Sequence, residues 1–138
     1  MITSENNIQI RYDEVDKMGY VYHGNYAKYY HISRTELMRS IGFSDKELEN
    51  YNIIMPIIEL NIKYLKPVYY DDIITIKTLL RQLPDTRMRF DHEVRNANNV
   101  LINTASSTVV FVDMETRLPM RAPKFFVDKL KPYFEDEN

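Results

Sequence analysis

The chain has 138 residues, 44% of them hydrophobic and 28% charged, which is typical of one globular domain. A formal net charge of −2 gives no general basic field that would point to nucleic acid. The absence of cysteine excludes disulfides, thiol nucleophiles and thiolate metal sites. Because the start is polar and no run of roughly 18 apolar residues occurs, we expect a cytoplasmic protein without signal peptide or membrane span.

The chain is expected to open with a short strand and a loop. Residues 7–12 alternate isoleucine and tyrosine with polar neighbours, which predicts a half-buried strand with Tyr12 on its core side. Residues 13–22 show no regular period and contain Gly19. They are predicted to form a loop.

Two helices are expected next. Residues 25–41 place apolar side chains at helical spacing, with Gly24 or Asn25 able to cap the start and Gly42 able to end the helix in a left-handed conformation. A capping-box pattern then begins at Ser44 and predicts a second, short helix to about residue 51.

The second half of the chain is predicted to be mostly β. Apolar and alternating runs predict four strands, over residues 53–66, 73–82, 86–97 and 100–112. The third run alternates most clearly, and its expected core side carries Met88, Phe90, His92 and Val94. A final helix is expected from about residue 123 to residue 134, followed by a solvated acidic tail.

This order of elements predicts an α+β fold in a single domain, residues 1–138. Four consecutive strands joined by short turns are expected to form an antiparallel meander. The long helix would then cover one face of that sheet. In the first strand of this meander, residues 53–66, the side chains of Ile58, Leu60, Ile62 and Tyr64 are expected to face inward.

The stretch from residue 12 to residue 36 concentrates the chemistry. The whole chain has three glycines and three histidines, and this window contains two of each. Two carboxylates, Asp16 and Glu36, lie near its ends, and six of the eleven tyrosines fall within it. A glycine-containing loop that carries an acid and a histidine just before a helix is a candidate active site, because a helix N-terminus offers free N–H groups.

The loop also resembles that of a known family. Asp16, Gly19, His23, Asn25 and Tyr26 follow the pattern of the hotdog-fold thioesterases, of the 4-hydroxybenzoyl-CoA thioesterase-like family, and most closely the branch associated with the Tol–Pal system. Further matches are the segments 34–36, 64–68, 71–72 and 110–113, and Pro123. The resemblance implies a hotdog fold, in which an antiparallel sheet wraps around one long helix, and hydrolysis of acyl-CoA.

The resemblance also implies roles for particular residues. Asp16 would be the nucleophile or the general base, and the sequence leaves both open. The backbone N–H of His23 would stabilise the oxyanion, and the side chains of His23 and Tyr12 would assist catalysis. Substrate would be bound by Gly19, Val21, Tyr22, Asn25 and Tyr26.

The resemblance further implies partners and alternatives. The substrate would be an acyl-CoA or an acyl carrier protein, and the protein a homodimer or homotetramer, since an open sheet edge is a liability. No cofactor, metal or nucleic acid is expected. A non-catalytic acyl-CoA-binding protein and a dehydratase acting on acyl carrier protein substrates remain alternatives. Cations available for the CoA phosphates are Lys63, Lys66, Arg87, Arg89, Arg95 and Arg121.

The other titratable groups in the candidate regions have structural interpretations. His92 alternates with core residues and is expected to be a buried, hydrogen-bonded histidine. His31 is expected at the surface or at an interface. Glu36 is the rival acid to Asp16, but its position on the helix flank, near Arg34 and Arg39, favours an ion pair.

Overall fold

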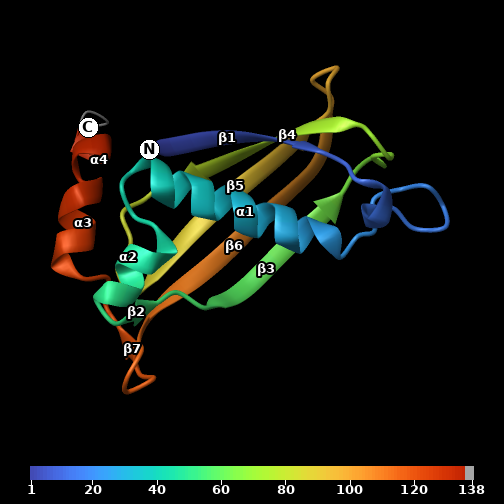
Figure 1. Ribbon diagram of the computed structural model, residues 1–138. Coiled ribbons are helices and arrows are strands. Elements are labelled where there is room, and N and C mark those ends of the chain that lie inside the picture. Colours follow the sequence, from blue (N-terminus) through green and yellow to red (C-terminus); the bar gives the residue numbers. More distant parts are fainter. Residues whose placement is uncertain (136–138) are drawn as a thin grey trace.

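A computed structural model describes residues 1–135 (Figure 1); residues 136–138, most of the predicted acidic tail, lie outside the described residues. The helices are η1 (a 3-10 turn, Tyr12–Glu14), α1 (Asn25–Ser40), α2 (Asp45–Asn50), α3 (Lys124–Leu130) and α4 (Pro132–Glu135). The strands are β1 (Ile2–Gln9), β2 (Ile53–Ile54), β3 (Ile57–Tyr64), β4 (Ile73–Leu80), β5 (Arg87–Arg95), β6 (Leu101–Asp113) and β7 (Pro119–Met120).

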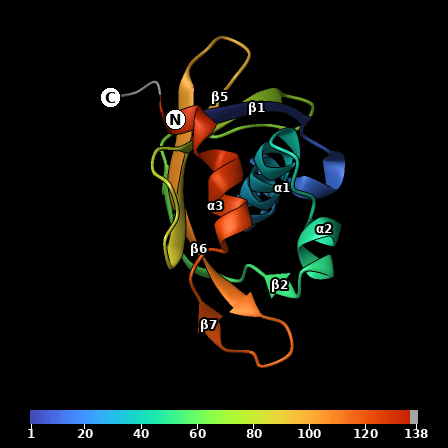
Figure 2. The ribbon, with the colours of Figure 1, turned by 90° about the vertical axis from the view of Figure 1, so that its left-hand side faces the viewer.

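The sheet is antiparallel and wraps around one long helix, as predicted. Its main strands lie in the order β1-β4-β5-β6-β3. Helix α1 crosses one face, and Figure 2, which views α1 almost along its axis, shows it lying against the sheet with α2 and α3 beside it. Within the part of the chain that the structure describes, no helix is long and apolar enough to cross a bilayer.

The prediction of a four-strand meander was wrong for β3. Of the four predicted strands, only those that became β4, β5 and β6 follow one another as neighbours, whereas β3 pairs with β6 and forms an edge of the sheet. The connection of residues 65–72 is therefore not a hairpin turn. It crosses the end of the sheet, where Tyr69 bridges to Tyr20, so this segment supports the predicted reactive loop.

Helix α1 follows its predicted pattern closely. Tyr26, Tyr30, Ser33 and Leu37 are buried along one side, as the spacing of apolar positions indicates. Gly42 follows the helix with φ of +90°, a conformation that glycine adopts without strain. The Ser44 side chain accepts a hydrogen bond from the Glu47 N–H at 3.2 Å, so Ser44 caps the predicted start of α2, whereas the reciprocal bond of a capping box, from the Ser44 N–H to the Glu47 side chain, is not formed among the described residues.

Two predicted strands were wrong in detail. The first begins at Ile2 rather than residue 7 and ends at Gln9, because it pairs along its whole length with β4. Pro56, which cannot donate to a ladder, separates β2 from β3. Of the residues expected to face inward from β3, Ile58 and Tyr64 are about half exposed, while Leu60 and Ile62 pack against the core.

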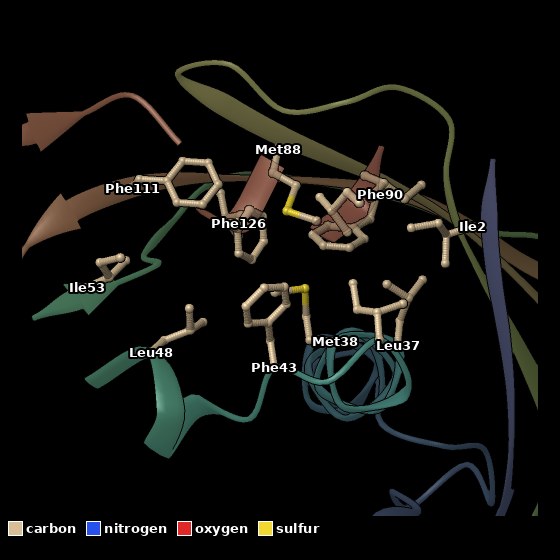
Figure 3. Packing of buried hydrophobic residues seen from close by; sticks show 14 residues of the cluster. Ile2, Leu37, Met38, Phe43, Leu48, Ile53, Met88, Phe90, Phe111 and Phe126 are labelled. Atoms are coloured by element: carbon tan, nitrogen blue, oxygen red, sulfur yellow. The ribbon is translucent and has the colours of Figure 1, made fainter. Parts of the chain in front are cut away.

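The core consists of two clusters, one toward each end of α1. The first gathers side chains from α1, α2, α3 and the sheet (Figure 3). In it, Phe126 of α3 packs against Phe43 and Phe111, with ring centroids 4.6 and 5.4 Å apart. The predicted C-terminal helix is present but is divided before Pro132, and Phe125, next to the buried Phe126, is 37% exposed.

The second cluster carries the tyrosines. Tyr26, Tyr29 and Tyr30 are all buried in it. Tyr26 contacts the rings of the other two at centroid distances of 5.6 and 6.3 Å. The Tyr30 hydroxyl donates to the side-chain oxygen of Asn103. This cluster lies under the loop that carries the predicted site.

His92 is the buried, hydrogen-bonded histidine that the alternation predicted. It is 1% exposed, its Nδ1 lies 3.1 Å from the Thr78 hydroxyl, and its Nε2 lies 2.9 Å from that of Ser107. Burial, with a smaller contribution from the positive charge of Arg34, lowers the pKa of His92 to about 3. The imidazole is therefore neutral at neutral pH.

The low pKa of His92 makes stability fall with acid. Below about pH 6.5 the unfolded chain protonates this histidine, while the folded protein does not do so until about pH 3. We expect the free energy of unfolding to fall by about 2 kcal/mol between pH 7 and pH 5 from this residue alone. Urea unfolding of wild type and His92→Gln at both pH values measures the difference. The control His31→Gln, at an exposed histidine, should keep the wild-type dependence of the unfolding free energy on pH. If His92→Gln kept it as well, the pH dependence would not come from His92.

Candidate active site

Asp16 lies in a tight, hydrogen-bonded turn. Its N–H donates to the carbonyl of Tyr20 at 2.9 Å, and its carbonyl accepts from the N–H of Gly19 at 3.0 Å. Gly19 closes the turn with φ of +82°, which few other residues adopt readily. The turn thus needs a glycine at this position, and it fixes the backbone of Asp16.

Backbone contacts anchor the loop to the rest of the protein. The N–H of Val21 donates to the carbonyl of Val68 at 2.8 Å, and that of Tyr22 to the carbonyl of Glu14 at 2.9 Å. The Asn25 side-chain amide also donates to the Glu14 carbonyl, at 2.8 Å. The side chain of Asn25, predicted to bind substrate, therefore holds the loop at the start of α1.

One cavity of about 330 Å³ brings the loop, the start of α1 and the end of β3 together. The loop contributes Asp16 and His23, and α1 contributes Tyr26. The opposite wall comes from the end of β3 and the segment after it: Tyr64, Leu65, Lys66, Pro67 and Val68. Acidic, basic and aromatic groups thus surround a largely apolar space, as in many small-molecule sites.

The Asp16 carboxylate is half-buried in this cavity and only partly engaged. Its Oδ1 accepts a hydrogen bond from the N–H of Met18 at 2.9 Å. Within residues 1–135, the other carboxylate oxygen accepts no hydrogen bond and makes no ion pair. One oxygen is therefore oriented by the protein while the other remains available for a substrate or a water molecule.

The start of α1 offers two free donors, one of them on His23, which lines the same cavity. Among the described residues, the backbone N–H groups of His23 and Gly24 have no hydrogen-bond partner, whereas those of Tyr22 and Asn25 do. Such groups at a helix N-terminus carry partial positive charge. They are suited to hold a carbonyl oxygen on which negative charge develops.

Tyr64 also belongs to the site, although the sequence predicted it only as an inward-facing residue of a strand. Its hydroxyl donates to the carbonyl of His23 at 3.0 Å, and its ring meets those of Tyr26 and His23 edge to face, at 5.6 and 6.2 Å. Burial, and to a lesser extent Tyr22, raises the pKa of Tyr64, which keeps the hydroxyl protonated and able to donate. The sequence signal was its place in the segment 64–68 that matches the family.

The structure brings four of the eight predicted site residues to this cavity: Asp16, Val21, His23 and Tyr26. Gly19 shapes the turn, Asn25 fixes the loop, and Tyr22 stacks on the His23 ring at a centroid distance of 4.4 Å. These three residues do not line the cavity.

Tyr12 lies elsewhere. It is 78% exposed, so its expected place in the core was wrong: the strand ends at Gln9 and the chain turns into η1 before Tyr12 can face inward. Its ring contacts Tyr70 at 5.6 Å, and both line a separate hollow of about 690 Å³ between β1 and α1. That hollow is larger, but neither Asp16 nor His23 lines it.

The remaining candidates behave as predicted or lie away from the cavity. Glu36 forms an ion pair with Arg39, and His31 is exposed. Of the six cations considered for the CoA phosphates, Lys66 alone lines the Asp16 cavity. Within the described part of the chain, no three histidines and carboxylates are grouped so as to hold a metal ion.

The fold and the cavity define a hotdog protein whose candidate site lies where the sheet edge meets the start of the central helix. Residues 10–130 match the family model of the thioesterase-like superfamily. The chain belongs to this superfamily, and the predicted family and fold are confirmed.

Individual relatives are similar over nearly their whole length. The chain is 30% identical to the putative acyl-CoA thioesterase YneP of Bacillus subtilis over 128 residues, 93% of each chain. It is 31% identical to the acyl-CoA thioester hydrolase YbgC of Escherichia coli over 124 residues, 90% of this chain and 92% of that protein. The structure of a DHNA-CoA thioesterase from Staphylococcus aureus superimposes with a TM-score of 0.90 at 32% identity, covering 99% of this chain and 92% of that one.

Proposed function

We propose that this protein hydrolyses the thioester of an acyl-CoA to the free acid and CoA. The observation that carries the proposal is that the partly free carboxylate of Asp16 and His23 line one cavity, and that the N–H groups of His23 and the adjacent Gly24 have no partner among the described residues. The carboxylate would supply a nucleophile or base, and the N–H groups would supply an oxyanion site. Similarity to proteins named as acyl-CoA thioesterases supports the same activity.

Two routes use the same residues. In one, an Asp16 oxygen attacks the thioester carbonyl carbon, the C–S bond breaks, CoA leaves as its thiolate, and water then hydrolyses the mixed anhydride. In the other, Asp16 takes a proton from a water molecule as the water oxygen attacks the same carbon. In both, the N–H groups of His23 and Gly24 hold the carbonyl oxygen. The His23 side chain, also beside the cavity, can orient the acyl group or carry a proton.

The rest of the substrate and a second subunit have places in this proposal. Lys66 lines the cavity, and in this proposal it would meet a CoA phosphate. The edge strand β3 pairs on one side only, with β6, and it exposes Ile57 and Ile58. Pairing of β3 with β3 of a second copy would cover this edge and place the cavity at the subunit boundary of a homodimer.

Thiol release from a series of acyl-CoAs of different chain length, and from acyl carrier protein thioesters, tests the function. We expect CoA release with at least one acyl-CoA, and a dependence of kcat/KM on the acyl group. Tight binding of acyl-CoA without any release would favour a binding protein instead. Release from carrier protein thioesters alone would change the substrate class.

The hydroxyl of Tyr64 is expected to contribute to the rate. It donates to the carbonyl of the His23–Gly24 peptide, and the N–H of that same peptide is one of the two free donors. The hydrogen bond therefore orients and polarises this donor. Tyr64→Phe keeps the ring contacts, so we expect kcat to fall about tenfold with little change in KM.

The matched control is Tyr51→Phe, which removes the hydroxyl of an exposed tyrosine at the C-terminal end of α2 that does not line the cavity. It should retain the wild-type kcat. An unchanged kcat in Tyr64→Phe, with the protein folded, would remove this hydroxyl from the mechanism.

A further inference from the structure

Arg34 is a partly buried cation without an anion. Its Nη1 is inaccessible to solvent and has no hydrogen-bond partner. Among residues 1–135 the guanidinium forms no ion pair, although Arg39, on the same helix, pairs with Glu36. Burial lowers the pKa of Arg34, but an arginine remains charged at neutral pH. Withdrawing part of a charged group from water without a partner is costly, which points to a function that needs Arg34.

The guanidinium lines a cavity of its own, of about 220 Å³. Its walls are mainly apolar and come from α1, the start of β3 and the sheet: Met38, Met55, Ile57, Phe90 and Val109. His31, Thr35 and Asp45 complete it. His31 and Asp45 are exposed, and Asp45 makes no ion pair with Arg34. A single cation within apolar walls is suited to a carboxylate attached to a small apolar body.

This cavity and the Asp16 cavity lie at opposite ends of one strand. Ile57, the first residue of β3, lines the Arg34 cavity, and Tyr64, the last residue, lines the Asp16 cavity. Residues of α1 line both, so both lie on the helix side of the sheet. Within one chain Arg34 follows Tyr26 by eight positions on α1, about 12 Å along the helix axis, which exceeds the length of a short acyl group.

Two-fold pairing of β3 would bring the Arg34 cavity of one subunit close to the Asp16 cavity of the other. β3 is an edge strand, and an antiparallel partner related by a two-fold axis near its middle would place the start of one strand beside the end of the other. The Arg34 cavity of one subunit would then adjoin the Asp16 cavity of its partner. The two cavities would form one composite site, which a single chain cannot complete.

We propose that Arg34 of the partner subunit completes the acyl-binding site beside Asp16 and receives a carboxylate at the far end of the acyl group. The preferred substrate class is then the CoA thioester of a short dicarboxylic acid. The thioester end lies at Asp16 and at the N–H groups of His23 and Gly24, and the distal carboxylate lies against the guanidinium. This inference rests on the proposed thioesterase function.

Matched substrates test the preference. Succinyl-CoA and glutaryl-CoA carry a distal carboxylate, whereas butanoyl-CoA and pentanoyl-CoA have the same chain length without it. We expect wild type to have the higher kcat/KM for the charged member of each pair, and Arg34→Gln to reduce the charged-to-neutral ratio at least tenfold. The control Arg39→Gln, an exposed arginine on the same helix, should keep the wild-type ratio.

The outcomes separate this inference from the function on which it rests. If the neutral substrates are hydrolysed and Arg34→Gln leaves the charged-to-neutral ratio of kcat/KM unchanged, the proposed role of Arg34 is overturned and the proposed thioesterase function stands. No hydrolysis of any acyl-CoA would overturn both.

The melting temperature gives an independent test of the Arg34 charge. Arg34→Met should raise the melting temperature of the ligand-free protein by about 2–4 °C. A lower melting temperature would show that Arg34 stabilises the ligand-free protein and would overturn the idea that its charge is uncompensated.

Mixed dimers test the contribution of the partner. When Asp16→Asn and Arg34→Gln proteins are mixed and allowed to exchange subunits, each mixed dimer contains one site with both native residues. We expect succinyl-CoA hydrolysis to recover to about a quarter of the wild-type rate, because half of the dimers are mixed and each has one intact site. Absence of recovery would show that Arg34 does not act across the interface.

Discussion

Asp16→Asn is expected to lower kcat for thioester hydrolysis about 10³-fold. The amide has nearly the shape of the carboxylate, and its oxygen can still accept the N–H of Met18, so the turn should be kept. The asparagine amide is neither a nucleophile for the carbonyl carbon nor a base for water. General-base catalysis alone contributes about 10²–10⁴-fold to the rate. KM should change little, because the loop, the helix start and the wall from β3 remain in place.

Asp13→Asn is the matched control for this variant. Asp13 is an exposed carboxylate in η1, three positions before Asp16, and does not line the cavity. Its loss should leave kcat within a factor of about two. Stopped assays of thiol release for the three proteins measure the effect, and a kcat in Asp16→Asn close to that of wild type would exclude Asp16 from the chemistry.

Phe126→Ala is expected to cost about 3–5 kcal/mol of unfolding free energy, the range for truncating a fully buried aromatic side chain. Phe126 is 0% exposed and joins α3 to the sheet and to the chain after α1 through Phe111 and Phe43 (Figure 3). Its removal leaves a hole between three elements that cannot close without moving α3. Urea unfolding followed by circular dichroism measures the loss.

The adjacent phenylalanine is the control. Phe125 is 37% exposed and stacks on Tyr51 at the surface, at a centroid distance of 4.4 Å. Phe125→Ala should cost about 1 kcal/mol, since less apolar area is involved. If the two variants were equally stable, α3 would not be held by Phe126 as described.

The elements with strong local periodicity could be predicted from the sequence. The helix over residues 25–41 and the strand that contains His92 each follow one period over several turns or residue pairs, and both are present as expected. The position of β3 could not be predicted in this way. Its alternation is the same whether it lies beside β4 or beside β6, and only the crossing of residues 65–72 over the end of the sheet decides between them.

The candidate site shows the same limit. Asp16, Gly19 and His23 are close in sequence and follow a family pattern, so the loop could be identified before its geometry was known. Tyr64 donates to the His23 carbonyl across 41 positions, and the isolation of Arg34 depends on which acids the fold places near it. Such relations arise from tertiary packing and leave no local signal. Tyr12 is a case in which a local signal misled. Its alternation with Ile8 and Ile10 predicted a core position, but the strand ends before residue 12.

A crystal structure of Asp16→Asn soaked with an intact acyl-CoA tests the central claim most directly, since the substrate should survive in this variant. We expect the thioester oxygen within hydrogen-bond distance of the N–H groups of His23 and Gly24, and the residue 16 side chain against the carbonyl carbon. An acyl group bound in the hollow beside Tyr12, or a thioester far from the start of α1, would contradict the proposed site.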